Sequence, residues 1–177
     1  MLKKNVIVTG GLGFIGSNLI ELLLEKNFQV INVDKISYSS NFYNTKNFKK
    51  NKNYKFYKCD LNNFKKLDSI INKFKPDCIF NLAAETHVDR SIDNPENFIK
   101  SNIIGVYNLL QSFKKYSKRY NKSKLIHIST DEVFGDIKRG RSDEKTAYKP
   151  SSPYAACLLY TSPSPRDGLL SRMPSSA

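Results

Sequence analysis

The sequence has few cysteines and no long apolar run. No stretch is apolar over enough residues to predict a transmembrane helix. The three cysteines, Cys59, Cys78 and Cys157, show no CxxC spacing and no nearby histidine, which argues against a zinc site or a disulfide framework. Cys59 and Cys78 fall in strand-like runs and are expected to be buried, inert thiols. This usage fits a reducing cytoplasm, and no metal is expected.

Acidic residues are also scarce, since 16 Asp and Glu stand against 29 Lys and Arg, a net charge of +13. Lysines crowd residues 46–58 and 114–124, which opens the alternative of nucleic-acid binding. They are interleaved with Asn, Ser and Tyr, and no recognition motif accompanies them, so a solvated surface is favoured. Met1–Lys4 lead straight into a strand-like run, so no secretory leader is expected. We therefore expect a soluble protein that binds neither nucleic acid nor a membrane.

The most informative stretch is Val6–Gly16, a β-branched run followed at once by glycines and an apolar helical pattern. It predicts a strand, a phosphate-binding loop and a helix. Gly10 can adopt the turn dihedrals, Gly13 lets the backbone approach a pyrophosphate, and Gly16 lets the helix pack tightly on the strand. The unpaired N–H groups and positive dipole end of the helix N-terminus suit a diphosphate. The alternative is an ordinary tight turn.

Two later features favour a dinucleotide site. The helix after the glycines is expected to present one apolar face, made by Ile15, Leu19, Leu22 and Leu23. A second strand, residues 29–34, ends in Asp34 about twenty residues downstream. A carboxylate there can accept the ribose hydroxyls of an adenosine and repel a 2′-phosphate, which favours NAD over NADP.

The rest of the chain alternates between strand and helix patterns. Further strands are expected at residues 54–59, 77–82 and 124–129. One helix is expected from Phe64 to Pro76, and a long one from Asn94-Pro95 onward. The inner face of the long helix is assigned to Phe98, Asn102, Val106, Leu109, Leu110 and Phe113. This alternation predicts an α/β fold with a doubly wound parallel sheet, a Rossmann-type domain.

A hydroxyl and two carboxylic acids, Thr130-Asp131-Glu132, follow the strand at 124–129. Neighbouring, partly buried carboxylates would repel each other, so the pKa of one would rise and an acid and a base would be available together. The competing interpretation is a turn or helix cap that uses Asp131.

These motifs together resemble the extended short-chain dehydrogenase/reductase family, and within it the group of dTDP-glucose 4,6-dehydratases. The resemblance covers residues 3 to about 156. The motifs that carry it are Thr9–Gly16, Val33–Lys35, Leu82–Ser91, Ser129–Gly135 and Ser152-Pro153-Tyr154. The Asp-Glu pair after the threonine is the most specific, because epimerases of the same family usually carry small residues there.

The resemblance implies a nucleotide-sugar dehydratase that converts dTDP-glucose to its 4-keto-6-deoxy product by an internal NAD redox cycle with loss of water. Tyr154 would deprotonate the C4 hydroxyl, Glu132 would remove the C5 proton, and Asp131 would protonate the departing C6 hydroxyl. Thr130 would orient the sugar, with Thr86 as a second substrate-binding residue. The full-length protein is expected to be a homodimer.

The motifs and the resemblance together assign the NAD-binding residues. They are Gly10, Gly13, Phe14, Ile15, Gly16, Asp34, Lys35, Ser37, Asp60, Leu61, Leu82, Ala83, Ala84, Thr86 and Ser101. Several of them follow predicted strands, at the sheet edge where open α/β folds bind ligands.

The family pattern breaks at Leu158, because the family carries a lysine four residues after the active-site tyrosine. From there to Ala177 the chain has no Lys, Asn or Ile and is crowded with Ser, Pro, Arg and Leu. We therefore expect an incomplete NAD-binding domain over residues 1–157, truncated before its last strands and the substrate domain. Residues 158–177 are interpreted as a non-native tail of vector, adapter or out-of-frame sequence, with a divergent native C-terminus as the alternative.

Three functions stay open at this point. The favoured one is the dehydratase, with this chain itself inactive. A second within the same class is an NAD-dependent nucleotide-sugar epimerase or a dehydratase for another nucleotide sugar. The third is a non-catalytic NAD-binding module, which the missing lysine favours.

Overall fold

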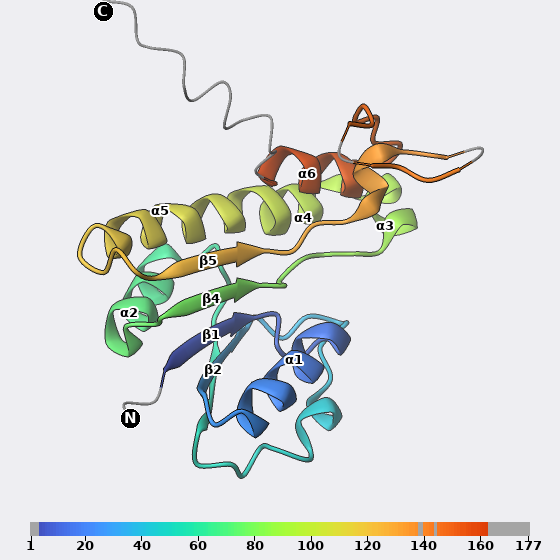
Figure 1. Ribbon diagram of the computed structural model, residues 1–177. Helices are drawn as coiled ribbons and strands as arrows, with labels where there is room; N and C mark the ends of the chain where they lie inside the picture. Colours follow the sequence, from blue (N-terminus) through green and yellow to red (C-terminus); the bar gives the residue numbers. More distant parts are fainter. Residues whose placement is uncertain (1–3, 138–139, 144, 163–177) are drawn as a thin grey trace, which may run out of the picture.

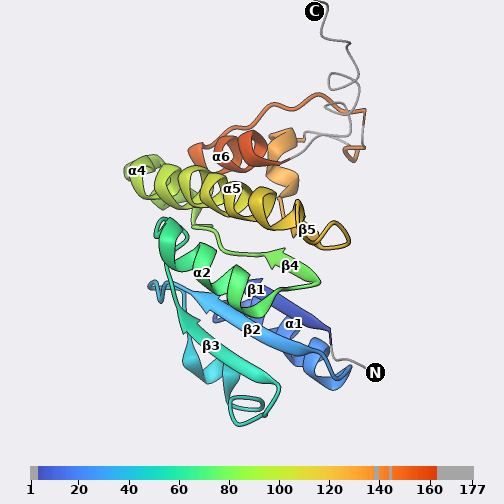
Figure 2. The same ribbon diagram turned by 90° about the vertical axis from the view of Figure 1, so that its left-hand side faces the viewer.

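The computed structural model describes residues 4–137, 140–143 and 145–162, which form a five-stranded parallel sheet in the order β3-β2-β1-β4-β5 (Figures 1 and 2). The strands are β1 (Asn5–Thr9), β2 (Gln29–Asp34), β3 (Tyr54–Lys58), β4 (Cys78–Asn81) and β5 (Lys124–His127). The α-helices are α1 (Phe14–Glu25), α2 (Phe64–Phe74), α3 (Val88–Asp93), α4 (Pro95–Phe98), α5 (Gly105–Ser117) and α6 (Pro153–Thr161). Shorter helical segments are η1 (Phe42–Thr45), the π-helical η2 (Ile99–Ile104) and η3 (Asp131–Phe134). The predicted α/β fold with a doubly wound parallel sheet is confirmed.

Strand β1 lies in the middle of the sheet and is buried on both faces. Its side chains alternate, so that Ile7 points into one apolar cluster while Val6 and Val8 point into another. All three are at most 2 % exposed. A strand covered by helices on both faces is expected to be a continuous run of β-branched residues, which explains this segment of the sequence.

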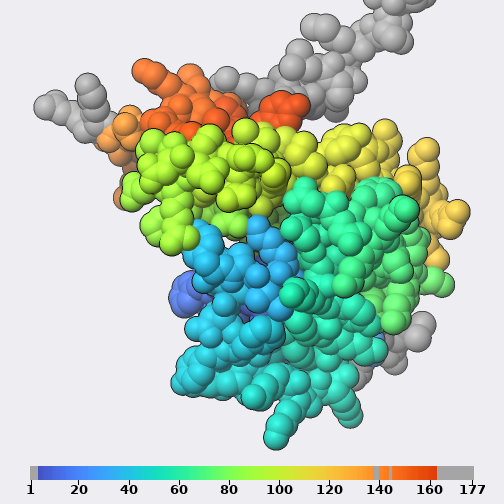
Figure 3. All heavy atoms as spheres, turned by 180° about the vertical axis from the view of Figure 1, so that it is seen from behind, coloured from blue at the N-terminus to red at the C-terminus, as the bar shows by residue number. Residues whose placement is uncertain are grey.

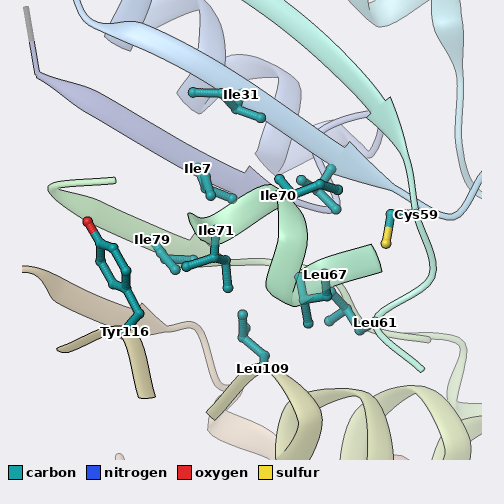
Figure 4. Close-up of a cluster of buried hydrophobic side chains, with 11 residues drawn as sticks. Ile7, Ile31, Cys59, Leu61, Leu67, Ile70, Ile71, Ile79, Leu109 and Tyr116 are labelled. Atoms are coloured by element: carbon teal, nitrogen blue, oxygen red, sulfur yellow. The ribbon is translucent and has the colours of Figure 1, made fainter. Parts of the chain in front are cut away.

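The helices α2 and α5 cover one face of the sheet. Figure 4 shows the cluster between them and the strands, where Leu67, Ile70 and Ile71 of α2 meet Ile7 and Ile31. The prediction for α2 is confirmed, because its apolar residues recur at helical spacing on the side that faces the sheet. At the far end of α5, the Tyr116 hydroxyl donates to the carbonyl of Pro76 at 3.0 Å, so this buried polar group has a hydrogen-bond partner.

The opposite face is covered by α1, whose buried side was predicted correctly for Leu19 and Leu23 but not for Ile15 and Leu22. Leu23 is buried as expected, but Ile15 and Leu22 are 64 % and 47 % exposed. Ile20 and Leu24 take their places against the sheet. The reason is that Gly16 packs directly on the glycine loop, which rotates the contact stripe away from Ile15.

The long helix expected from Asn94-Pro95 is present, but it is not uniform. It runs through α4, the π-helical η2 and α5, and a separate helix, α3, precedes it. Leu110, expected on the inner face, is 41 % exposed. The other residues assigned to the inner face agree with the prediction, because Phe98, Asn102, Val106 and Leu109 are buried and Phe113 packs against the core.

Helix α6 lies beside α4 and η2 (Figure 1) and builds a third apolar cluster. In that cluster Tyr154 and Leu158 pack with Phe98 and Val133. Helix α6 continues past residue 157 to Thr161, whereas residues 163–177 lie outside the described part of the chain. Among the described residues, none of the helices has the length and apolar character needed to cross a bilayer.

Candidate active site

A cavity of about 430 Å³ opens at the carboxyl ends of the strands. Figure 3 shows the molecule from behind, where blue and cyan residues of the N-terminal part lie beneath the lime-green segment. Every residue assigned above to cofactor binding lines this cavity. The strand ends therefore bring together segments that are far apart in the sequence, as expected for an open parallel sheet.

The glycine loop leaves no room for a side chain at Gly10 or Gly16. Gly10 has φ +72 and donates its N–H to the Val33 carbonyl at 2.9 Å. A Cβ on Gly16 would lie 2.8 Å from Gly11 Cα and would collide with the Gly10 carbonyl oxygen. Helix α1 begins just after Gly13, and no side chain caps its N-terminus. The residues of this helix end that line the cavity are small or apolar, so the N–H groups and dipole of the helix are available to an anion.

The Asp34 carboxylate is buried at the end of β2, with a relative exposure of 6 %. It accepts hydrogen bonds from Leu12 N at 3.0 Å, Ile36 N at 2.8 Å and the Ser40 hydroxyl at 2.8 Å. A carboxylate offers about four lone-pair positions, so it retains capacity for a ligand hydroxyl. These contacts hold the glycine loop against the end of β2.

Lys35 directly follows β2, and its side chain reaches the segment after β4. Its ammonium lies 2.5 Å from Glu85 Oε1 and donates to the Ser101 hydroxyl at 2.8 Å. Glu85 was not singled out from the sequence, because it is 50 positions from Lys35 and belongs to no local motif for an ion pair. The pair links the end of β2 to the segment after β4.

Tyr154 is held at the start of α6 by two contacts. The Ser152 hydroxyl caps the helix by accepting from Ala155 N at 3.1 Å, and Tyr154 N donates to the Ser91 hydroxyl of α3 at 3.2 Å. The side chain is 8 % exposed and lines the cavity. Burial raises the pKa of the Tyr154 phenol, while a hydrogen bond with the Thr130 side chain opposes this rise.

The structure brings Thr130, Asp131 and Glu132 to the phenol of Tyr154. The negative charges of Glu132 and Asp131 add to the rise in the Tyr154 pKa, which places both carboxylates within electrostatic reach. The expectation that the two carboxylates are partly buried is wrong, since both are exposed. The capping residue is Thr130 and not Asp131, because the Thr130 hydroxyl accepts from Glu132 N at 3.3 Å. This cap fixes the direction of the two acids.

Sequence reasoning missed part of the cavity lining. The additional residues are Val33, Ser39, Ser40, Cys59, Ile128, Ser129 and Leu158. Leu158 is only 2 % exposed, so the position of the family's lysine carries a buried apolar side chain. Burial raises the pKa of the Cys59 thiol, which agrees with the expected inert thiol. Among residues 4–137, 140–143 and 145–162, no cluster of three metal-binding side chains occurs.

Comparisons with known proteins agree with this geometry. Residues 7–162 match the family described as GDP-mannose 4,6 dehydratase. The chain is 41% identical over 160 residues to the dTDP-glucose 4,6-dehydratase of Haemophilus influenzae, covering 86% of this chain and 47% of the relative. It therefore spans about half the length of the curated relatives it matches.

Solved structures of nucleotide-sugar enzymes also superpose on this chain. A dTDP-glucose 4,6-dehydratase from Bacillus anthracis, in complex with NAD, superposes with a TM-score of 0.76 at 37% identity and covers 89% of this chain and 48% of that chain. A UDP-glucose 4-epimerase from Thermotoga maritima, with UDP-glucose, gives a TM-score of 0.77 at 33% identity, with 89% and 48% covered. The resemblance inferred from the motifs is confirmed. Because the family match extends over most of its residues, the chain belongs to the family described as GDP-mannose 4,6 dehydratase.

Proposed function

We propose that this chain is the NAD-binding part of a dTDP-glucose 4,6-dehydratase. The observation that carries the proposal is the meeting of the Tyr154 phenol, which lines the cavity, with the Thr130 hydroxyl and the carboxylates of Asp131 and Glu132. Elimination of water from a sugar next to a carbonyl needs a base, an acid and a group that takes a hydroxyl proton, and these side chains provide all three.

The cavity fits NAD. The open N-terminus of α1 suits the pyrophosphate, and the glycine loop has no Cβ to obstruct it. Asp34 retains an acceptor position for a ribose hydroxyl at the end of β2. When bound, NAD would supply a hydride acceptor that is regenerated in each turnover.

The chain's own residues would move the protons. Tyr154, once deprotonated, would take the proton of the C4 hydroxyl, and Thr130 would orient the sugar through the hydroxyl that now bonds to the phenol. Glu132 would remove the C5 proton and Asp131 would protonate the departing C6 hydroxyl. The exposure of both carboxylates supports these assignments, because an exposed carboxylate is accessible to a substrate. Thr86, which lines the cavity, would also contact the substrate.

The proposal also covers the substrate, compartment and assembly of the complete protein. The substrate would be dTDP-glucose, the compartment the cytoplasm, and the assembly a homodimer. The dTDP-glucose 4,6-dehydratases among the relatives support the substrate, with 35% to 41% identity over more than 80% of this chain. The domain boundary at residue 157 and the non-native origin of residues 158–177 stay predictions.

The test is product analysis with the full-length gene product. It should convert dTDP-glucose to a 4-keto-6-deoxy sugar, and a deuterium placed at C4 should appear at C6. Glu132→Gln should lower the rate about 100-fold or more by removing a general base, and Glu25→Gln, an exposed carboxylate at the end of α1, serves as the matched control. Products that all retain the 6-hydroxyl would overturn the dehydratase assignment and favour the epimerase.

A second candidate, a non-catalytic NAD-binding module, is favoured by one observation. Leu158 places a buried apolar side chain where the family pattern has a lysine beside the tyrosine. This candidate predicts NAD binding without turnover even in the full-length product. Titration calorimetry with NAD together with the product assay separates the two.

A further inference from the structure

We propose that Glu85 makes this cavity prefer a dinucleotide without a 2′-phosphate, and that it does so by holding the ammonium group of Lys35. The inference rests on the proposed NAD site and adds a residue that determines its specificity. Glu85 itself would touch neither the cofactor nor the substrate. It would act through Lys35.

Lys35 is the cation that a 2′-phosphate would need. Among the described residues that line the cavity, it is the only Lys or Arg. It directly follows Asp34 at the end of β2, where dinucleotide folds recognise the 2′ position of the adenosine ribose. An acid there accepts the hydroxyl of NAD, whereas a nearby cation accommodates the phosphate of NADP. The sequence Asp34-Lys35 therefore places both kinds of group side by side.

The structure shows that this cation already has a partner. The Lys35 ammonium lies 2.5 Å from Glu85 Oε1, and the side chain of Glu85 is only 8% exposed. The Ser101 hydroxyl accepts a second hydrogen bond from the same ammonium at 2.8 Å. The charge of Lys35 is thus offset in a partly buried pair, where ionic interactions are screened less than at the surface.

Glu85 cannot follow Lys35 toward a ligand, because its backbone is fixed on both sides. Glu85 N donates to Asn102 Oδ1 at 2.8 Å, and Asn102 Nδ2 donates to the Glu85 carbonyl at 2.9 Å. Asn102 is fully buried and belongs to the π-helical segment η2. The same segment carries Ser101, so one local distortion of the helix positions both partners of Lys35, Glu85 through Asn102 and Ser101 directly.

In the part of the chain that the structure describes, no cation forms an ion pair with Asp34. Its carboxylate accepts from two backbone N–H groups and the Ser40 hydroxyl, all of them neutral donors. A 2′-phosphate at the end of β2 would therefore face the negative charge of Asp34 next to a lysine that Glu85 has neutralised. Like charges at such short range are repulsive unless a free cation offsets them.

The experiment compares the affinities of NADP and NAD by titration calorimetry for four variants. Glu85→Gln keeps the size of the side chain but removes its charge, and it should raise the affinity of NADP relative to NAD about fivefold or more, as expected for a newly available ion pair of roughly 1 kcal/mol. Adding Lys35→Met to Glu85→Gln should return the ratio to that of the wild type. Glu96→Gln, which removes the charge of another glutamate paired with a lysine, Lys100, at an exposed position outside the cavity, is the matched control and should leave the ratio within twofold.

The outcomes separate the two proposals. If the wild-type chain binds NAD and the ratio for Glu85→Gln stays within twofold of the wild type, the NAD site stands and the role of Glu85 is wrong. A purely structural role would weaken both dinucleotides equally and give that result. If the wild type binds neither dinucleotide, the proposed NAD site fails and the inference falls with it. If Glu85→Gln does not fold, Lys35→Met alone provides the test. A rise in the affinity of NADP relative to NAD for that variant would also overturn the proposal.

Discussion

Leu158 follows Tyr154 by one helical turn in α6, and both side chains are buried and line the same cavity. In the family pattern this position is a lysine, whose charge would lower the pKa of the phenol. Here the apolar neighbour cannot do so, and burial raises that pKa instead. Deprotonation of the phenol is therefore less favourable here than beside a lysine.

The first prediction is that the 177-residue chain does not turn over dTDP-glucose, and that Leu158→Lys does not restore turnover. Leu158 packs with Phe98 and Val133, so a lysine ammonium placed there would lose apolar contacts and be poorly solvated. We expect Leu158→Lys to lower the free energy of unfolding by roughly 3 kcal/mol. Leu158→Met, which conserves volume, should cost less than about 1.5 kcal/mol. Urea unfolding and a product assay check both, and turnover by either chain would contradict the assignment of the site.

The second prediction concerns the titration of Tyr154. Glu132→Gln removes a negative charge that raises its pKa, so the pKa should fall relative to the wild type. Thr130→Val removes the hydrogen bond that lowers it, so the pKa should rise further. Carbon-13 labelled tyrosine followed by NMR against pH gives the values, with Tyr154→Phe to assign the signal. A pKa unchanged in both variants would mean that these side chains do not meet in solution.

The third prediction separates two glycines of the phosphate loop. Gly16→Ala should destabilise the fold by about 1–3 kcal/mol, because the new methyl group meets the backbone of Gly10 and Gly11. Gly13→Ala places its methyl 3.3 Å from the Gly10 carbonyl oxygen and at the cavity wall, so it should fold normally but bind NAD more weakly. Chemical denaturation and calorimetry measure the two effects. Equal stability of Gly16→Ala and the wild type would show that the loop is looser than described.

The fourth prediction is a pH dependence of stability that arises from His127. Thr9 Oγ1 donates to Asn81 Oδ1 at 2.5 Å, and Asn81 Nδ2 lies 2.8 Å from His127 Nδ1, which therefore accepts. Burial lowers the pKa of His127, so the folded chain binds its proton more weakly than the unfolded chain. The stability contributed by neutral His127 is then fully present above about pH 6.5 and is lost as the pH falls below that value toward the folded pKa.

The two histidines of the chain provide the matched comparison. His127→Gln should flatten the fall in the free energy of unfolding between about pH 6.5 and pH 5. His87→Gln, a change at an exposed residue, should leave that slope unchanged. Urea unfolding at a series of pH values measures it. Identical slopes for the two variants would exclude His127 as the source.

The sequence by itself determined the features that depend on neighbouring residues. The spacing of Gly10, Gly13 and Gly16 predicts the loop, because a strand, turn and helix in succession leave too little space for side chains at such positions. The parallel order of the strands follows from their alternation with helices, since crossovers are right-handed and short. Thr130 and the acids after it were recognised for the same reason, as a local run at a strand end.

Only the tertiary structure decided the features that depend on contacts between distant segments. The pairing of Lys35 with Glu85 joins residues 50 positions apart, and it depends on a π-helical turn that no propensity scale indicates. The buried side of α1 was also decided this way, because the close packing of Gly16 on the loop turns Ile15 toward the cavity. Hydrophobic periodicity reports that a helix has an apolar side, but the packing partner determines which residues that side contains.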